Sequence, residues 1–271
     1  MTIDGRTEIY GIIGRPVAHS LSPAMHNAAF AALGLNKAYL PFEVEDVAGA
    51  LTGLRALGIR GASVTIPHKQ TVLPYLDEID PVAAKIRAVN TLVVSGGKLR
   101  GLNTDWLGAN RALAEKLRLG GSRVLLLGAG GSARAIGFGL LEAGAEIVIA
   151  SRTPEKGQAL ARALGCPWLP LAEAGDHRAD ALVNATSVGM DPLAETMPVR
   201  KEALARFGVV MDIVYAPLAT KLLQEAAAAG CQTIDGLSML LYQGAAQFEL
   251  WTGQTAPLAV MREALLAGLP Q

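Results

Sequence analysis

The chain has 271 residues, of which 51% are hydrophobic and 18% charged, and its 24 Lys and Arg residues balance 24 Asp and Glu. This composition excludes a disordered chain, and the balanced charge argues against nucleic acid or a membrane surface as the main partner. A small molecule is therefore the expected ligand. The length predicts two domains of modest size, each large enough to bury a core.

Targeting segments and structural cysteines are not expected. The longest charge-free stretch, residues 16–36, is too polar and too interrupted by proline to span a bilayer. Asp4 and Glu8 precede any apolar run, which is untypical of a secretory signal, so we expect a cytoplasmic protein. Cys166 and Cys231 are far apart and lack metal-binding spacing, so we expect core residues, no metal site and no disulfide.

Short β-branched runs alternate with Ala- and Leu-rich stretches, which predicts an α/β fold of parallel sheets covered by helices. In the first part of the chain we expect strands at residues 9–14, 38–44, 59–66 and 91–94, and helices at 23–33, 47–57 and 71–75. A hairpin is expected to turn at Gly96-Gly97.

A second series of elements begins at Arg123. Its expected strands are residues 124–127, 147–150, 181–184, 209–213 and 232–234, with helices that end at Gly144 and Gly165 and further helices at 220–229, 237–253 and 258–266. Helix 106–117 is the predicted connector. We therefore predict a first domain of residues 1–105 plus 237–271, since the terminal helices are free to return to it, and a second of residues 106–236.

A glycine-rich turn follows strand 124–127 directly and opens a helix. Such a turn lets the backbone approach a pyrophosphate, and the helix N-terminus supplies unpaired N–H groups, although a glycine after a strand can also be a simple turn. The residues predicted to bind the cofactor here are Gly128, Ala129, Gly130, Gly131, Ser132 and Ala133.

The end of the next strand carries no acidic residue for a ribose hydroxyl, as NAD-binding domains require. It carries Ser151, Arg152 and Thr153, followed by Pro154 and Lys156. Thr153 as a helix cap, with the cationic side chains of Arg152 and Lys156 nearby, suits a 2′-phosphate. NADP(H) is therefore favoured over NAD as the cofactor. A capped helix with solvated charges is the alternative interpretation.

Polar residues of the first domain form a candidate ligand site. Ser20 and Ser22 stand before Pro23 at a helix start, where two hydroxyls suit a carboxylate, although Ser22 as a helix cap needs no ligand. Lys69 follows strand 59–66, at the end where ligands of α/β sheets collect, although a lysine there is often a solvated charge. Asp105 alone is typical of a cap for helix 106–117, but with Lys69 it forms a candidate acid/base pair.

These motifs together resemble the shikimate dehydrogenase family over nearly the whole chain. They are GRP at 14–16, HSLSP at 19–23, HN at 26–27, VTIPHK at 64–69, AVNT at 88–91, NTD at 103–105, GAGGSA at 128–133, NATSVGM at 184–190, D, YAP and T at 212, 215–217 and 220, DG at 235–236 and Q at 243. The resemblance implies an N-terminal α/β substrate domain, a Rossmann-type doubly wound NADP domain and NADPH-dependent reduction of 3-dehydroshikimate to shikimate in aromatic amino-acid biosynthesis.

The resemblance also implies roles for single residues. Ser20 and Ser22 would bind the substrate carboxylate, Thr65, Asn90, Asp105 and Gln243 would bind ring hydroxyls, Lys69 and Asp105 would be catalytic, Tyr215 would lie near substrate, and Thr186, Val214, Gly236 and Met239 would lie near the cofactor. The histidines at 19, 26 and 68 are expected to be packing or surface residues. We expect a monomer or homodimer.

One position departs from the family pattern: Ser63 stands where the family usually has Asn. A quinate/shikimate dehydrogenase paralogue therefore stays open as an alternative. A second alternative is a non-catalytic sensor of NADP(H) and a polyhydroxylated acid, against which the presence of both Lys69 and Asp105 argues.

Overall fold

The structure is a computed structural model and describes residues 3–269. The described residues divide into two compact units: unit 1 comprises the chain up to Thr104 together with Gln243–Leu269, and unit 2 comprises Asp105–Tyr242. Both units contain a sheet covered by helices, so the predicted α/β class is confirmed. Between residues 3 and 269 no helix is long and apolar enough to cross a membrane.

Unit 1 is built on a mixed sheet. Its strands are β1 (Glu8–Gly14), β2 (Lys37–Glu43), β3 (Gly61–Val64), β4 (Glu78–Ile79), β5 (Thr91–Ser95) and β6 (Lys98–Leu102), in the order β2-β1-β3-β5-β6-β4. β1 is parallel to β2 and β3, but β5 is antiparallel to β3 and β6. The hairpin predicted at Gly96-Gly97, where both glycines have a positive φ, is confirmed, and it joins the antiparallel neighbours β5 and β6, so the sheet is mixed rather than parallel throughout.

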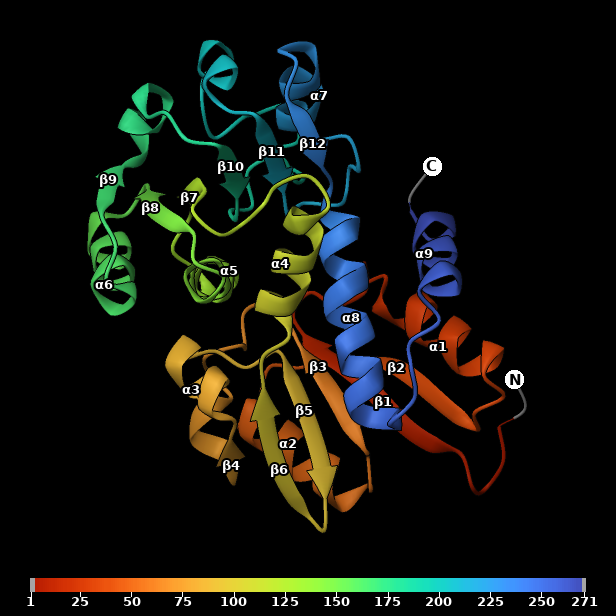
Figure 1. Cartoon of the computed structure of the whole chain (residues 1–271). Helices are drawn as coiled ribbons and strands as arrows, with labels where there is room; N and C mark the ends of the chain where they lie inside the picture. Colours follow the sequence, from red (N-terminus) through yellow and green to blue (C-terminus); the bar gives the residue numbers. More distant parts are fainter. Residues whose placement is uncertain (1–2, 270–271) are drawn as a thin grey trace. The chain divides into compact units, whose positions relative to one another are not determined.

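The helices of unit 1 cover both faces of this sheet (Figure 1). They are α1 (Ser22–Ala32), α2 (Val47–Ala56), α3 (Pro81–Ile86), most of α8 (Gly236–Thr252) and α9 (Leu258–Ala267). The buried face of α2 repeats at Val47, Leu51 and Leu54, the spacing of one helical stripe, and packs in one apolar cluster with Ile13 and Leu92. α9 packs against α1.

Three local expectations, two in unit 1 and one at the first residue of unit 2, are wrong. Ser22 does not cap α1: it is the first helical residue, and its N–H donates to Ser20 Oγ at 3.3 Å. The helix expected at 71–75 is a single 3₁₀ turn, Leu73–Tyr75, because Pro74 lies inside it. Asp105 is the first residue of α4 rather than the residue before it.

Unit 2 is a parallel sheet of the doubly wound type. Its strands are β7 (Arg123–Leu127), β8 (Glu146–Ser151), β9 (Trp168–Pro170), β10 (Ala181–Asn184), β11 (Val209–Asp212) and β12 (Gln232–Ile234), in the order β9-β8-β7-β10-β11-β12. Numbered along the unit, this is the order 3-2-1-4-5-6 of a Rossmann fold, which has its switch point between β7 and β10. Ligands of such sheets bind beyond the carboxyl ends of the strands at that point.

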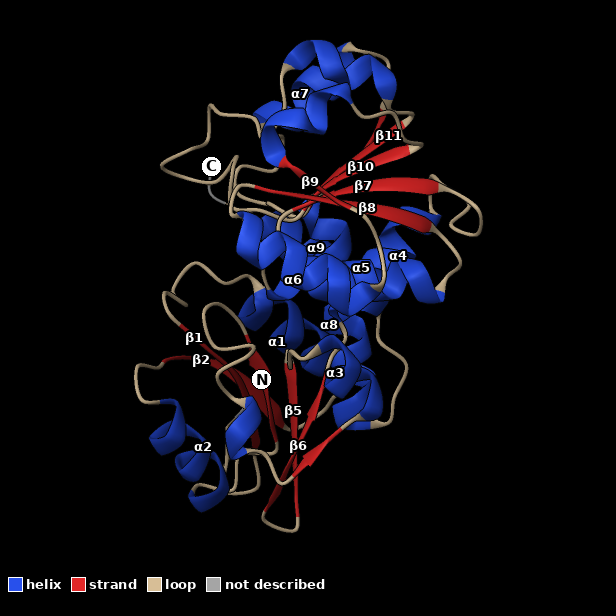
Figure 2. Ribbon diagram, turned by 90° about the vertical axis from the view of Figure 1, so that its left-hand side faces the viewer, coloured by secondary structure: helices blue, strands red, loops and turns tan. Residues whose placement is uncertain are grey.

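Alternating side chains of β7 separate two apolar layers. Val124 and Leu126 pack in the cluster that contains α4 (Asp105–Ala114), α5 (Gly131–Glu142) and α6 (Pro154–Leu164). Leu125 and Leu127 pack in the cluster that contains α7 (Lys221–Ala228) and two 3₁₀ helices, Leu171–Asp176 and Lys201–Arg206. Figure 2 shows α7 on one side of this sheet and α4, α5 and α6 on the other.

Candidate active site

The serines of unit 1 lie at the start of α1. Ser22 is buried and Ser20 is half-buried. The bond from the Ser22 N–H to Ser20 Oγ uses that oxygen as an acceptor, which leaves the Ser20 hydroxyl proton for another partner. Both hydroxyls are therefore placed beside the positive end of a helix, where a carboxylate is stabilised.

The segment after β3 carries Thr65 and Lys69. Thr65 is half-buried and its N–H donates to Ile13 O on β1 at 3.0 Å. A Cβ at Gly14 would clash with Thr65 Cγ2, so a glycine at 14 is what lets Thr65 lie against the end of β1. Lys69 is half-buried, and its carbonyl accepts the Val89 N–H at 2.7 Å, which brings it next to the chain that enters β5.

Asn90 is the centre of the polar residues in unit 1. Its Nδ2 donates to Thr104 Oγ1 at 2.9 Å and to Gln243 Oε1 at 3.2 Å, and its Oδ1 accepts the Thr104 N–H at 2.7 Å. Asn90 and Gln243 are 2% and 8% exposed, so these amides are held almost entirely out of water. The structure thus brings together two of the predicted hydroxyl-binding residues.

Asp105 follows Thr104 directly and begins α4. Its side chain is 3% exposed, and a carboxylate in the first turn of a helix is stabilised by the helix dipole. Since the backbone of Thr104 is bonded to Asn90, Asp105 is covalently next to the same polar residues.

In unit 2 the glycine turn follows β7, at the switch point between β7 and β10. Gly128 has a φ of +115°, and a Cβ there would lie 2.7 Å from Ala185 O, so no other residue fits. Gly130 caps α5 without a side-chain hydrogen bond, and a Cβ at Gly130 would meet nothing within 4 Å. The N-terminus of α5 is therefore open at Gly130, and backbone N–H groups at a helix N-terminus are donors of the kind that bind phosphate.

The remaining turn residues shape this cradle. Gly131 and Ser132 are half-buried in the first turn of α5, Ala129 is half-buried before it, and Ala133 is fully buried against β7. A small residue at 133 is what close packing of helix on strand requires.

The segment after β8 contains the predicted 2′-phosphate site. Arg152, Thr153 and Lys156 are exposed, and Thr153 precedes α6 without a side-chain capping bond. Ser151 is different: its hydroxyl donates to Thr153 O at 3.0 Å and accepts the Trp168 Nε1–H at 2.9 Å. Ser151 is 5% exposed, so it shapes the loop, whereas the side chains of Arg152 and Lys156 are accessible.

Asp212 joins the loops after β10 and β11. It accepts hydrogen bonds from Asn184 Nδ2 at 2.9 Å, from the Val214 N–H at 3.0 Å and from Thr220 Oγ1 at 2.8 Å. Burial raises the pKa of the Asp212 carboxyl to about 6, although the three donors favour its charged form. Thr186 contacts the same cluster through Asn184 Oδ1, at 2.7 Å from its hydroxyl. Thr186 and Val214 are therefore held at the carboxyl ends of neighbouring strands.

The start of α8 packs closely on the loop after β11. A Cβ at Gly236 would lie 2.5 Å from Ile213 O and 2.6 Å from Val214 O, so a side chain is excluded there. Met239, one turn later, is buried in the core of unit 2. Tyr215 is half-buried, and burial raises the pKa of its phenol.

Three histidines are not candidates for catalysis, as expected. His19 is exposed, and His68 is buried with its Nε2 2.8 Å from Val44 O. His26 is fully buried and stacks on Tyr39, with ring centroids 4.5 Å apart.

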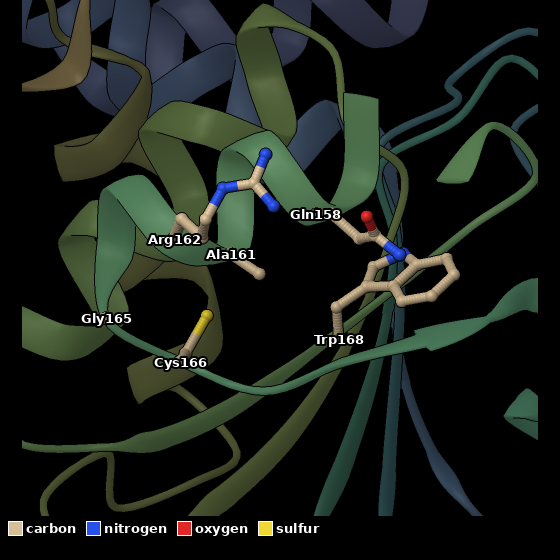
Figure 3. Close-up of a pocket in the computed structure, with 6 residues that line it drawn as sticks. All are labelled: Gln158, Ala161, Arg162, Gly165, Cys166 and Trp168. Atoms are coloured by element: carbon tan, nitrogen blue, oxygen red, sulfur yellow. The ribbon is translucent and has the colours of Figure 1, made fainter. Parts of the chain in front are cut away.

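A surface hollow between α6 and β9 is separate from the glycine turn (Figure 3). It is lined by Gln158, Ala161, Arg162, Gly165, Cys166 and Trp168. Burial raises the pKa of the Cys166 thiol to about 11, so the thiol stays protonated and unreactive. We assign no function to this hollow.

Some residues around the site have no role in the sequence prediction. Asp212 belongs to a motif of the resemblance, but its three hydrogen bonds appear only in the structure. Tyr39 and Gln247 are fully buried behind Asn90. A polar residue four positions after Gln243 on one helix is the only signal that pointed to Gln247.

The fold and these residues define a class of protein: an α/β enzyme with a dinucleotide-binding unit and a second unit that presents buried hydroxyl and amide groups to a small polar ligand. Family models match in three segments: the shikimate dehydrogenase substrate binding domain at residues 12–92, the shikimate/quinate 5-dehydrogenase model at 110–217, and the shikimate 5′-dehydrogenase C-terminal domain at 236–266.

Full-length comparisons agree with these models. Shikimate dehydrogenase (NADP(+)) of Moorella thermoacetica is 50% identical, over 97% of this chain and 94% of its own. A crystal structure of a shikimate dehydrogenase with NADP⁺ matches with a TM-score of 0.94 and 41% identity, covering 100% of this chain and 98% of that one. The Thermus thermophilus enzyme with NADP(H) and shikimate matches with a TM-score of 0.91 and 41% identity, covering 97% and 100%. The chain belongs to the shikimate dehydrogenase family.

Proposed function

We propose that the protein catalyses the reversible NADP-dependent interconversion of 3-dehydroshikimate and shikimate, a step of aromatic amino-acid biosynthesis. The observation that carries the proposal is 50% identity, over 97% of the chain, to a shikimate dehydrogenase (NADP(+)). The protein is accordingly an oxidoreductase. A cytoplasmic location and a monomeric or dimeric state stay predictions.

Unit 1 holds the substrate in this proposal. Ser20 and Ser22 bind the carboxylate beside the positive end of α1, and Thr65, Asn90 and Gln243 bind ring hydroxyls. The burial of Asn90 and Gln243 supports this role, because amides held out of water bind a hydroxyl without first losing a bulk water shell.

Unit 2 holds NADP(H). The backbone at Gly128–Ala133 binds the pyrophosphate, and the exposed Arg152 and Lys156 bind the 2′-phosphate. Thr186, Val214, Gly236 and Met239 surround the nicotinamide end, and Tyr215 lies near the substrate. Bound NADPH supplies the hydride that reduces the substrate carbonyl.

Lys69 and Asp105 carry the proton chemistry. Negative charge grows on the carbonyl oxygen during reduction, so the Lys69 ammonium at that oxygen stabilises the transition state more than the neutral ground state. Lys69 donates the proton that converts this oxygen to a hydroxyl. Asp105 orients the ammonium and binds a ring hydroxyl.

The two alternatives are less favoured. The relatives that match the full chain at about half identity are named shikimate dehydrogenase (NADP(+)), which favours shikimate over quinate as the substrate. A non-catalytic sensor is disfavoured by the presence of both Lys69 and Asp105.

The test is the nicotinamide absorbance of the purified protein with shikimate or quinate and with NADP⁺ or NAD⁺. We expect fastest turnover with shikimate and NADP⁺. Lys69→Met, which keeps most of the side-chain stem, should lower kcat by on the order of 10²-fold or more with a much smaller change in the KM for shikimate. Lys85→Met, at an exposed lysine on α3, is the matched control and should change neither constant.

No turnover of shikimate by the folded wild-type protein would refute the proposed function. Turnover by the wild type together with near-normal kcat for Lys69→Met would refute only the assignment of Lys69.

A further inference from the structure

A buried chain of hydrogen bonds lies behind Asn90 in unit 1. Tyr39 Oη donates to Ser63 Oγ at 2.6 Å, and Ser63 Oγ donates to Gln247 Oε1 at 2.8 Å. Gln247 Nε2 donates to Thr91 Oγ1 at 2.9 Å, and Thr91 Oγ1 donates to Asn90 Oδ1 at 2.7 Å. Each of these side chains is at most 6% exposed.

A backbone group fixes the orientation of Gln247 in this chain. Gln247 Nε2 is also 3.0 Å from the carbonyl oxygen of Asn90, and a carbonyl only accepts. The amide nitrogen of Gln247 must therefore face Asn90, and its oxygen must face Ser63. Ser63 then has to donate to Gln247, which leaves its oxygen to accept the phenol proton of Tyr39.

A second backbone group fixes the orientation of Asn90. The Thr104 N–H, which only donates, lies 2.7 Å from Asn90 Oδ1. Asn90 Nδ2 must therefore face Gln243, whose Oε1 accepts from it at 3.2 Å. The amide nitrogen of Gln243 consequently points away from Asn90.

We propose that Gln247 is a positioning residue for substrate binding, which it performs by holding the Asn90 side chain in place through Thr91 and through the Asn90 carbonyl. This inference rests on the proposed function, in which Asn90 and Gln243 bind ring hydroxyls.

The burial and spacing of Gln247 agree with this role. It lies four residues after Gln243, so both side chains lie on one face of α8, and it is 1% exposed. Gln247 bonds to Ser63 through its Oε1 and to the 90–91 segment through its Nε2. Ser63 is small enough to contact both Tyr39 and Gln247 with one hydroxyl.

The test is Gln247→Met, which has a similar length and cannot form these bonds. We expect the KM for shikimate to rise about tenfold, with less than a twofold change in the KM for NADP⁺ and a smaller change in kcat than in KM. Because the effect passes through the Asn90 side chain, Gln247→Met should add less than twofold to the KM of an Asn90→Ala variant.

Trp251→Phe is the matched control. Trp251 lies one turn further along α8, and its Nε1 donates to Leu92 O on β5 at 3.0 Å, so this variant also removes a bond from α8 to β5. It should leave the KM for shikimate unchanged. An equal rise in KM for Trp251→Phe, or fully multiplicative effects of the Gln247 and Asn90 variants, would overturn the proposal.

Thr91→Val provides a second test if Gln247→Met does not fold. It removes the link between Gln247 and Asn90 at nearly constant volume and should raise the KM for shikimate in the same direction, and an unchanged KM would overturn the proposal. The wild-type assay separates the role of Gln247 from the proposed function. Failure of the wild-type protein to turn over shikimate would refute the proposed function itself.

Discussion

Arg152 is the residue on which the preference for NADP over NAD depends in the proposed function. It is exposed just beyond β8, where its guanidinium can pair with a 2′-phosphate that only NADP carries. We expect Arg152→Ala to raise the KM for NADP⁺ roughly tenfold, equivalent to about 1.4 kcal/mol, and to leave the KM for NAD⁺ nearly unchanged. Steady-state kinetics with both cofactors measure this difference.

Arg162→Ala is the control for that variant. Arg162 is an exposed arginine in the last turn of the same helix, α6, so its loss changes the charge equally. Arg162→Ala should change neither the KM for NADP⁺ nor the KM for NAD⁺. An equal loss of NADP⁺ and NAD⁺ affinity in Arg152→Ala would show that Arg152 supports the loop rather than the 2′-phosphate.

Single residues also show where prediction from sequence ends. Ser151 was expected beside Arg152 as a cofactor ligand, but its hydroxyl is bonded to Thr153 and Trp168. Its partner Trp168 lies on β9, a three-residue strand without a periodic pattern. Tyr39, Ser63 and Gln247 meet from three separate elements, and no local pattern predicts which buried polar groups will pair.

Helix packing limits substitution at Gly236, the first residue of α8. A Cβ there would be 2.5 Å from Ile213 O and 2.6 Å from Val214 O, and these backbone atoms cannot move without displacing the loop after β11. We expect Gly236→Ala to lower the free energy of unfolding by about 1–3 kcal/mol, as overpacking does. Urea denaturation measures the change.

Gly53→Ala is the matched control, with the opposite sign. Gly53 lies inside α2, and a Cβ there would meet nothing within 4 Å. The same substitution should therefore raise the free energy of unfolding by about 0.5–1 kcal/mol, because alanine loses less conformational entropy on folding. Stabilisation by Gly236→Ala would contradict the close contact at the start of α8.

The elements that the sequence predicted well share a physical cause. β10 and β12 have the predicted bounds, 181–184 and 232–234, because short apolar or β-branched runs are bounded by polar residues. β4 and β9 were missed because two or three residues carry no period, and their pairing depends on β6 and β8. The strand expected at 59–66 is shorter, because only residues 61–64 pair with β1 and only residues 61–63 pair with β5.

Across the whole molecule, two buried groups make the stability of the two units respond oppositely to pH. In unit 1, His26 is fully buried, and burial lowers the pKa of His26 from 6.5 to about 3. The unfolded chain therefore takes up a proton below about pH 6.5 that the folded unit does not, so the stability present above that pH is lost progressively as the pH falls.

In unit 2 the sign is reversed. Burial raises the pKa of Asp212 from 3.8 to about 6, so between these values the folded unit binds a proton that the unfolded chain does not. The stability contributed by Asp212 therefore increases as the pH falls through about 6, and it is complete below about 4.

We therefore expect acid to separate the unfolding of the two units. From pH 7 to about pH 4.5, His26 should destabilise unit 1 and Asp212 should stabilise unit 2, each by on the order of 2 kcal/mol. Calorimetry at the lower pH should show unit 1 melting first, as a transition resolved from that of unit 2.

His26→Phe keeps an aromatic ring against Tyr39 and should raise the melting temperature of the lower transition at acid pH more than at pH 7. His19→Phe, at an exposed site, should not. Equal shifts for the two histidine variants would contradict the role of His26. Asp212→Asn should shift the melting temperature of the upper transition more favourably at pH 7 than at acid pH, because an amide takes up no proton in this range. This pH dependence is the opposite of that expected for His26→Phe.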